Sequence, residues 1–132
     1  MKNDERTPVK NFYDLEIWKE ANKLSVEVYT LTKAFPESEK FGITSQIRRA
    51  ASSVGANIAE GFGRYHFKDK IKFYYNARGS TCETQNFIFL SQSLGYLEKE
   101  NARKIFCKYD NLGKRINQFI KSVGNKSATS DQ

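Results

Sequence analysis

The chain has 132 residues, of which 39% are hydrophobic and 28% charged, and its formal net charge is +7. This length and composition suit one globular domain that folds without disulfides or metals. The sequence shows no secretory signal and no stretch that reaches the roughly 20 apolar residues of a membrane span, so we expect a cytoplasmic protein with no membrane partner.

The first predicted element is a helix over residues 12–34, preceded by a polar segment, residues 1–11, that we expect to be disordered. Apolar and small residues recur in this helix every three or four positions, the period of a helix with one buried face. They are Leu15, Trp18, Ala21, Ser25, Val28 and Leu31. Because the residue before a proline is pushed out of the α region, Phe35 and Pro36 should end the helix.

The second predicted helix begins near Ile43 and ends at Gly61. Its apolar stripe at helical spacing consists of Ile43, Ile47, Ala51, Val54 and Ile58. Small residues surround this stripe, and we expect them to let a neighbouring backbone approach closely. Gly61 suits a left-handed C-cap, so residues 62–65 should form the turn that follows.

The third predicted helix covers residues 68–97. Its apolar face contains Ile71, Tyr74, Ala77, Thr81, Ile88 and Phe89. Gly79 lies near the middle of this helix, where glycine costs about 1 kcal/mol of helix stability relative to alanine. We interpret Gly79 as a close contact between helices rather than as a break.

The fourth predicted helix follows at once and reaches Val123. Its apolar residues form a heptad-like seam. They are Ile105, Tyr109, Leu112, Ile116, Phe119 and Val123. The polar residues 124–132 should then form a disordered tail.

Four amphipathic helices joined by short links predict an all-α fold, an antiparallel up-down four-helix bundle formed by residues 12–123. Several apolar residues fall outside the main stripes, and a single bundle core would leave some of them in water. They are Phe12, Ile17, Val26, Phe73, Tyr75 and Phe87. This surplus indicates a homo-oligomer.

The residues that catalysis usually needs are scarce. His66 is the only histidine and has basic neighbours, no Glu-x-x-His pair marks a di-iron site, and no phosphate-binding glycine loop occurs. Cys82 and Cys107 form no ligand pattern, and we expect free thiols. We therefore expect no catalytic residue, no metal and no cofactor, and a hydrolase that uses Glu60 and Glu83 is the least favoured interpretation.

Glu60 and Glu83 each lie among small residues on a predicted helix. A carboxylate on a packed helix is rarely buried without a cation. Arg49 precedes Glu60 by eleven residues, which is about 16 Å along a helix, so these two cannot pair directly. We interpret both carboxylates as structural, each paired with an arginine of a neighbouring helix or chain.

Basic residues are the remaining functional signal. Residues 42–80 carry seven basic and two acidic side chains, and residues 98–123 carry seven and three. An uneven charge of this kind indicates an anionic partner, but a basic protein whose lysines are only hydrated would look the same. Charge alone leaves both interpretations open.

Two groups of basic residues carry the nucleic-acid hypothesis. Four lie within residues 64–72, where Tyr65 or Phe67 could stack on bases. A second group forms a stripe on the fourth helix, opposite its apolar seam. No motif of a sequence-specific DNA or RNA reader occurs. The pattern predicts binding to the phosphates of RNA or DNA by Arg48, Arg49, Arg64, Lys68, Lys72, Arg78, Lys104, Lys108 and Arg115.

Three stretches of the sequence resemble a known family. They are LEIWKEANKLSVEVYTLTKAFP at residues 15–36, QIRRAASSVGANIAEGFGR at residues 46–64 and FYYNARGSTCETQNFIFLSQSLGYL at residues 73–97. Their Arg-Arg-Ala, Asn-Ile-Ala-Glu-Gly and Ala-Arg-Gly-Ser motifs, in this order, are similar to those of a family of small bacterial four-helix bundles. That family includes proteins encoded by intervening sequences in large-subunit ribosomal RNA genes and accessory variability proteins of diversity-generating retroelements.

The resemblance implies a homopentamer of four-helix protomers with a basic surface. The retroelement relatives bind a reverse transcriptase and nucleic acid. The resemblance to them implies an alternative function, a protein–protein adaptor that docks a partner such as a reverse transcriptase. The residues that match the family pattern are Arg48, Arg49, Asn57, Glu60, Gly61, Arg64, Arg78, Gly79, Ser80 and Glu83. One departure is Gln85, where the family often has a second glutamate, and it speaks against a paired-carboxylate site.

Overall fold

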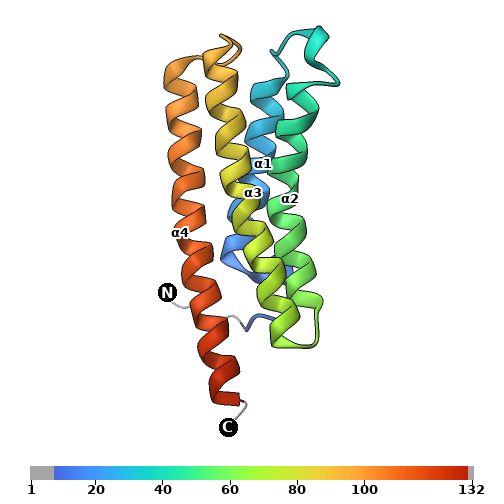
Figure 1. Ribbon diagram of the computed structural model, residues 1–132, viewed down its shortest axis with the longest axis vertical. Coiled ribbons are helices and arrows are strands. Elements are labelled where there is room, and N and C mark those ends of the chain that lie inside the picture. The colour runs from blue at the N-terminus through green and yellow to red at the C-terminus, as the bar shows by residue number, and fades with distance from the viewer. Residues whose placement is uncertain (1–7, 131–132) are drawn as a thin grey trace.

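The computed structural model describes residues 8–130. Its helices are α1 (Glu16–Thr32), α2 (Ile43–Gly63), α3 (Phe67–Ser93) and α4 (Lys99–Ser130), and two short 3-10 turns, η2 (Phe12–Asp14) and η3 (Glu37–Glu39), precede α1 and α2. Figure 1 shows the four long helices running along the long axis of the molecule. Each packs against the next one in sequence, and α1 closes the bundle against α4. The predicted all-α four-helix bundle is confirmed.

The core lies between the four helices and contains most of the predicted apolar stripes. All five predicted residues of the second helix are buried. The large side chains that are almost fully buried are Leu24, Val28, Ile47, Val54, Ile58, Tyr74, Ile88, Tyr109, Leu112 and Ile116. Phe89 is an exception, because it was assigned to the apolar face of the third helix and is 60% exposed.

The first helix begins later than its periodicity predicted. The Asp14 carboxylate accepts hydrogen bonds from the backbone N–H groups of Lys10 (3.1 Å) and Asn11 (3.0 Å), which ties the chain into η2. As a result, α1 begins only at Glu16. Most of the N-terminal segment that we expected to be disordered, residues 1–7, lies outside the described residues.

The second helix extends past Gly61, which we expected to cap it, and ends at Gly63. Gly61 is buried. A Cβ atom built on it would lie 2.6 Å from Tyr74 Cε1 and 3.1 Å from the carbonyl oxygen of Lys70. Gly61 is therefore a close contact between α2 and α3, and the C-cap prediction is wrong.

Two other glycines show how the third helix differs from its prediction. A Cβ atom on Gly79 would meet no atom within 4 Å, so Gly79 is not a close contact between the described helices of one chain. Gly95 has a φ of 82°, in the left-handed region that favours glycine. The third helix accordingly ends at Ser93, before its predicted end at residue 97.

The fourth helix continues beyond its predicted end at Val123 and runs through Ser130. Most of the tail that we expected to be disordered is thus helical, while residues 131–132 lie outside the described residues. No proline interrupts α4, and adding residues to an existing helix is much easier than nucleating a new one. Figure 1 shows this end of α4 projecting past the α2–α3 turn.

Most of the surplus apolar residues are covered within a single chain. Ile17 is buried, and Phe12, Phe73 and Phe87 are half-buried. Val26 and Tyr75 stay exposed. Of the six surplus apolar residues that predicted a homo-oligomer, only these two are exposed in a single chain.

Candidate nucleic-acid interface

The basic residues of the link between α2 and α3 lie at one end of the bundle. Lys70, in the first turn of α3, reaches back toward the end of α2. Its ammonium group donates hydrogen bonds to the carbonyl oxygens of Phe62 (2.7 Å) and Gly61 (3.5 Å). Carbonyl groups at a helix C-terminus lack partners within the helix, so Lys70 fastens the two helices together. Burial lowers the pKa of Lys70.

Arg64 is also engaged within the chain. Its guanidinium donates a hydrogen bond to Glu60 Oε2 (3.0 Å) and lies 4.5 Å from the centre of the Phe73 ring. The prediction that Glu60 pairs with an arginine of a neighbouring helix or chain is wrong, because Arg64, the residue directly after α2, is four positions beyond Glu60 and reaches its carboxylate. Both side chains are about half exposed, so the pair adds little stability, but it offsets the charge of Arg64.

Lys68 and Lys72 are cations of the α2–α3 turn that no other described side chain engages. Both are exposed, and they lie one turn apart on α3, about 6 Å along its axis. Neither makes an ion pair with another described residue. Tyr65 is 89% exposed, whereas Phe67 is half-buried. The structure therefore leaves Tyr65, more than Phe67, open to stack on a base.

The end of α4 adds positive charge to the same region. The rings of Tyr74 and Phe119 pack in a T-shape with centroids 4.9 Å apart, which places the end of α4 beside the start of α3. Lys121 and Lys126 are exposed there. The sequence pattern does not connect Lys121 with the α2–α3 turn, because the two are about 50 residues apart in the chain.

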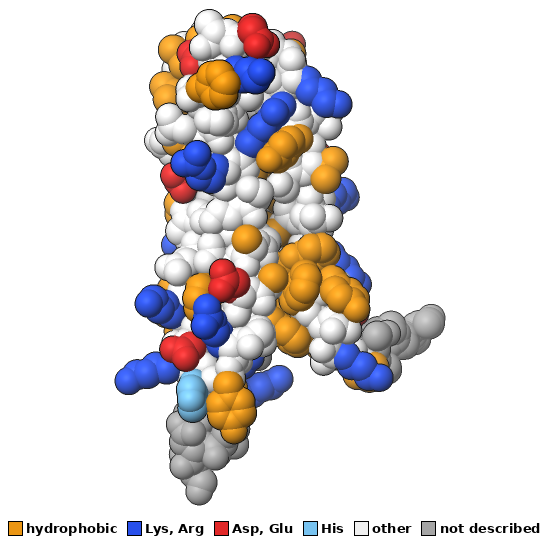
Figure 2. Space-filling view, turned by 90° about the vertical axis from the view of Figure 1, so that its right-hand side faces the viewer, with side chains coloured by type: hydrophobic (Ala, Val, Ile, Leu, Met, Phe, Trp, Pro, Cys, Tyr) orange, Lys and Arg blue, Asp and Glu red, His pale blue; other side chains and the backbone are white. Residues whose placement is uncertain are grey.

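Residues 60–72 and 119–126 form what we call the basic end. Together they carry six basic and two acidic side chains. Figure 2 shows this end at the bottom, where the single histidine marks the α2–α3 turn. Basic side chains are scattered among acidic and apolar ones over the length of that face. The six basic and two acidic side chains of the basic end leave it with a net charge of +4.

Arg48 and Arg49 lie near the opposite end of the bundle, and only Arg49 is exposed. Arg48 donates hydrogen bonds to Thr32 Oγ1 (2.8 Å) and to the carbonyl oxygen of Tyr29 (3.3 Å), and its guanidinium lies 4.7 Å from the centre of the Tyr29 ring. Both partners belong to the end of α1. Arg48 therefore holds α2 against α1, and only Arg49 is left open for a ligand.

Several residues of the family pattern lie where α2 contacts α3. Ser80 Oγ of α3 is 3.0 Å from Ser53 Oγ of α2. Asn57 Nδ2 donates hydrogen bonds to Ser53 Oγ (3.0 Å) and to the carbonyl oxygen of Ser53 (2.9 Å). Arg78 is half-buried, and Glu83 is exposed. Neither charged residue has an ion pair with another described residue, so the predicted arginine partner of Glu83 is not found within one chain.

The predicted basic stripe of α4 lies on another side of the bundle. Lys108 Nζ is 3.1 Å and 3.2 Å from the two carboxylate oxygens of Glu27, an ion pair that joins α4 to α1. Lys104 and Lys108 line a groove of about 290 Å³ between these helices. Arg115 is half-buried. The structure does not gather the predicted contact residues into one surface, and only those of the α2–α3 turn lie at the basic end.

The described residues contain no group of three or more His, Cys, Asp or Glu side chains that could hold a metal ion. Cys82 and Cys107 are exposed free thiols. Within the same part of the chain, none of the helices has the length and hydrophobicity needed to cross a membrane.

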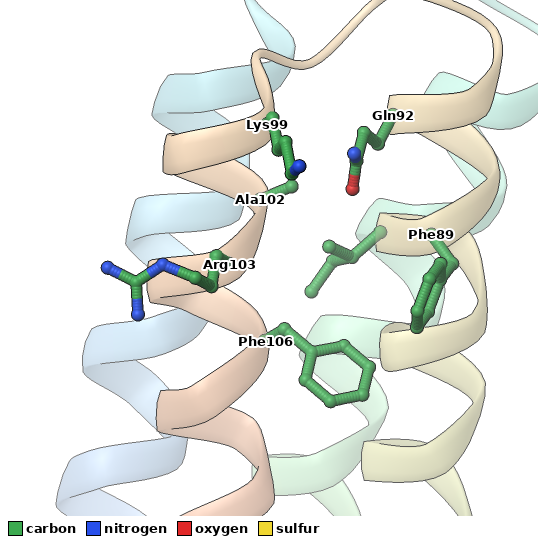
Figure 3. Close-up of a pocket in the computed structure, with 7 residues that line it drawn as sticks. Phe89, Gln92, Lys99, Ala102, Arg103 and Phe106 are labelled. Carbon is green, nitrogen blue, oxygen red and sulfur yellow. The ribbon is translucent and has the colours of Figure 1, made fainter.

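The sequence patterns did not reveal a groove of about 270 Å³ between α3 and α4. Phe89 and Phe106 line it (Figure 3). The sequence did contain a sign of this groove. Ile88 and Phe89 are adjacent, and adjacent residues of a helix do not share a face. With Ile88 in the core, Phe89 has to point toward the side of the bundle.

Comparison with known proteins gives the family. The family model described as "23S rRNA-intervening sequence protein" matches residues 13–118. The chain belongs to the 23S rRNA-intervening sequence protein family. No curated protein matches the chain significantly.

A solved structure shares the fold of this chain. It is a protein of unknown function from the S23 ribosomal protein family of Bacteroides thetaiotaomicron, with 23% identity and a TM-score of 0.71. The similarity covers 80% of this chain and 98% of that one, and it shows a shared fold. The resemblance stated from the three sequence stretches is confirmed. The family match includes the α2–α3 turn and ends before Lys121.

Proposed function

We propose that this protein is a non-enzymatic, cytoplasmic homo-oligomer that binds RNA or DNA through its phosphates, and that the basic end is the contact surface. The observation that carries the proposal is the pair of lysines, Lys68 and Lys72, which are exposed without an ion-pair partner among the described residues and lie beside exposed Tyr65. Membership of a family named for an intervening sequence in 23S rRNA supports RNA as the partner.

The mechanism is charge neutralisation. Each lysine that contacts a phosphate releases bound counterions, so affinity falls as salt rises. Phosphate contacts carry no sequence information of their own, in agreement with the lack of a reader motif. Tyr65 would add a sequence-tolerant stacking contact with a base. Arg49, Arg78, Lys104, Lys108 and Arg115 would contribute only where the nucleic acid extends beyond the basic end.

Self-association would strengthen such binding. The resemblance implies a pentamer, and α3 offers an exposed face that includes Tyr75 and Gly79, which suits a contact between copies. Several basic ends in one assembly would bind a polyanion with an avidity that one copy lacks. Light scattering coupled to size-exclusion chromatography tests this point, and a monomer at micromolar concentration would contradict it.

The experiment that tests the function compares two matched double variants. Lys68→Ala/Lys72→Ala removes two cations of the basic end, and Lys23→Ala/Lys33→Ala removes two exposed lysines of the α1 side. Fluorescence anisotropy measures the Kd of each for labelled RNA and DNA. We expect a loss of at least about tenfold for the first variant and less than about twofold for the second. Equal losses, or no binding by the wild-type protein, would contradict the proposal.

A second candidate function is a protein–protein adaptor. The end opposite the basic end exposes Phe41, which is 89% accessible, and Leu94, and apolar side chains of this kind suit a protein partner such as a reverse transcriptase. Phe41→Ala separates the two functions, because it should weaken a protein complex and leave nucleic-acid affinity unchanged.

A further inference from the structure

The groove between α3 and α4 has aromatic walls that are open to solvent. Phe89 of α3 and Phe106 of α4 form a T-shaped pair with ring centroids 5.3 Å apart. Ile88 and Ala102 line the same groove (Figure 3). Phe89 keeps more than half of its surface exposed, although it lies beside this apolar space. A flat apolar ligand could therefore cover it without any rearrangement of the core.

Polar groups stand at the open end of the groove. Figure 3 shows the side chains of Gln92 from α3 and Lys99 from α4 pointing into the space between the two helices, whereas the guanidinium of Arg103 points away. Arg103 is held on the outside by its ion pair with Glu100. The Gln92 amide and the Lys99 ammonium form no hydrogen bond or ion pair with other described residues, so both are available to a ligand.

We propose that this groove is a stacking site for one unpaired nucleobase, with Gln92 hydrogen-bonding to the edge of the base and Lys99 contacting an adjacent phosphate, an inference that rests on the function proposed above. The aromatic walls suit the face of a base. A carboxamide offers a donor and an acceptor, as base edges do. The ammonium group can attract an anion to the same end of the groove, and the phosphate of a nucleotide supplies one.

The size of the groove favours a single base. Sites for drug-sized ligands have volumes of about 300–1,000 Å³, and this groove, at about 270 Å³, is just below that range. A base within a duplex is stacked between its neighbours and cannot enter such a site, so the nucleic acid must be single-stranded. A protein side chain or a second copy of this chain would cover the same walls, and the experiment below separates those occupants.

The groove and the basic end lie on the same helix. Lys72 and Phe89 are separated by about 25 Å along α3, a distance that a strand covers with about seven nucleotides at about 3.4 Å each. An oligonucleotide of about 15 residues can thus contact the basic end and place one base in the groove.

The test uses the full chain and four proteins: wild type, Phe89→Ala, Phe89→Tyr and Leu90→Ala. Leu90 is an exposed apolar residue of α3 that does not line the groove, so Leu90→Ala is the matched control. Anisotropy measures the affinity of each protein for a 5-iodouridine-containing single-stranded RNA of about 15 nucleotides and for a duplex of the same length. Circular dichroism and light scattering check the fold and the assembly.

We expect Phe89→Ala to weaken single-strand binding on the order of tenfold, and to leave duplex binding unchanged. Phe89→Tyr and Leu90→Ala should bind like the wild type. Irradiation should cross-link the iodouridine to peptides that contain Phe89 or Phe106. If Phe89→Ala binds the single strand as tightly as the wild type does, the groove is not a base site, while the basic end keeps its proposed function.

Two other results would also overturn the base site. If the wild type binds neither RNA, the base site and the proposed function both fail. If Phe89→Ala changes the mass of the assembly, a second copy of the chain occupies the groove instead of a base.

Discussion

Two helical glycines with opposite surroundings give a sharp test of how α2 and α3 pack. Gly61→Ala would place a methyl group 2.6 Å from Tyr74 Cε1 and 3.1 Å from the Lys70 carbonyl oxygen. Tyr74 is 2% exposed and its ring packs against Phe119, so the ring cannot move aside without disturbing the core. Overpacking of this kind costs about 1–3 kcal/mol.

Helix propensity offsets part of that cost. Alanine stabilises a helix by about 1 kcal/mol relative to glycine, so the net effect of Gly61→Ala should be a loss of up to about 2 kcal/mol in the free energy of unfolding. Gly79→Ala is the matched control, because its methyl group meets no atom within 4 Å. It should gain about 0.5–1 kcal/mol.

Urea unfolding followed by circular dichroism, at one protein concentration, measures both effects. The midpoints should rise in the order Gly61→Ala, wild type, Gly79→Ala. A Gly61→Ala protein that unfolds at the wild-type urea concentration or above it would refute the close packing of Gly61 on Tyr74. If Gly79→Ala lowers the midpoint and reduces the mass of the assembly, Gly79 is packed against another copy of the chain.

Three further predictions concern single side chains. Tyr109→Phe should raise the free energy of unfolding by up to about 1 kcal/mol, since the Tyr109 hydroxyl is buried without a hydrogen-bond partner among the described residues; a clear loss in urea unfolding would show that the hydroxyl is satisfied after all. Burial raises the pKa of Tyr74 to about 12, above the roughly 10 of an unfolded tyrosine. The unfolded state therefore loses its proton first, and stability should fall between about pH 10 and pH 12, a fall that Tyr74→Phe should reduce in thermal melts across this range. Glu60→Gln releases Arg64 and should tighten RNA binding roughly threefold at low salt in anisotropy, whereas weaker binding would contradict a role for the basic end.

Much of the fold follows from periodicity, because a helix that buries one face repeats its apolar residues every three or four positions. The four helices and their order are visible in this way. The helix ends are not, since they depend on neighbours that are remote in sequence. Gly61 looks like a C-cap until Tyr74 is placed against it, and Gly95, which does adopt the left-handed conformation, lies in a stretch that periodicity continues as helix.

The candidate site was predictable only in part. The cluster of basic residues at the α2–α3 turn is visible in the sequence, and the fold leaves Lys68 and Lys72 exposed. For the other cations, the residue type alone does not show which are free to bind a ligand and which are engaged within the chain. Arg48 and Lys70 are recruited to carbonyl groups at helix ends, and Lys108 pairs with Glu27 across two helices that are far apart in sequence.

The salt dependence of RNA binding tests most directly whether the basic end acts by neutralising phosphates. The measurement is the Kd of a single-stranded RNA between about 50 and 200 mM salt, for the wild type and for Lys68→Ala/Lys72→Ala. We predict straight log–log plots, with a wild-type slope steeper by about 1.4, because each phosphate contact on a single strand contributes about 0.7. Identical slopes for the two proteins, or a wild-type affinity that does not change with salt, would contradict the neutralisation of phosphates by the basic end.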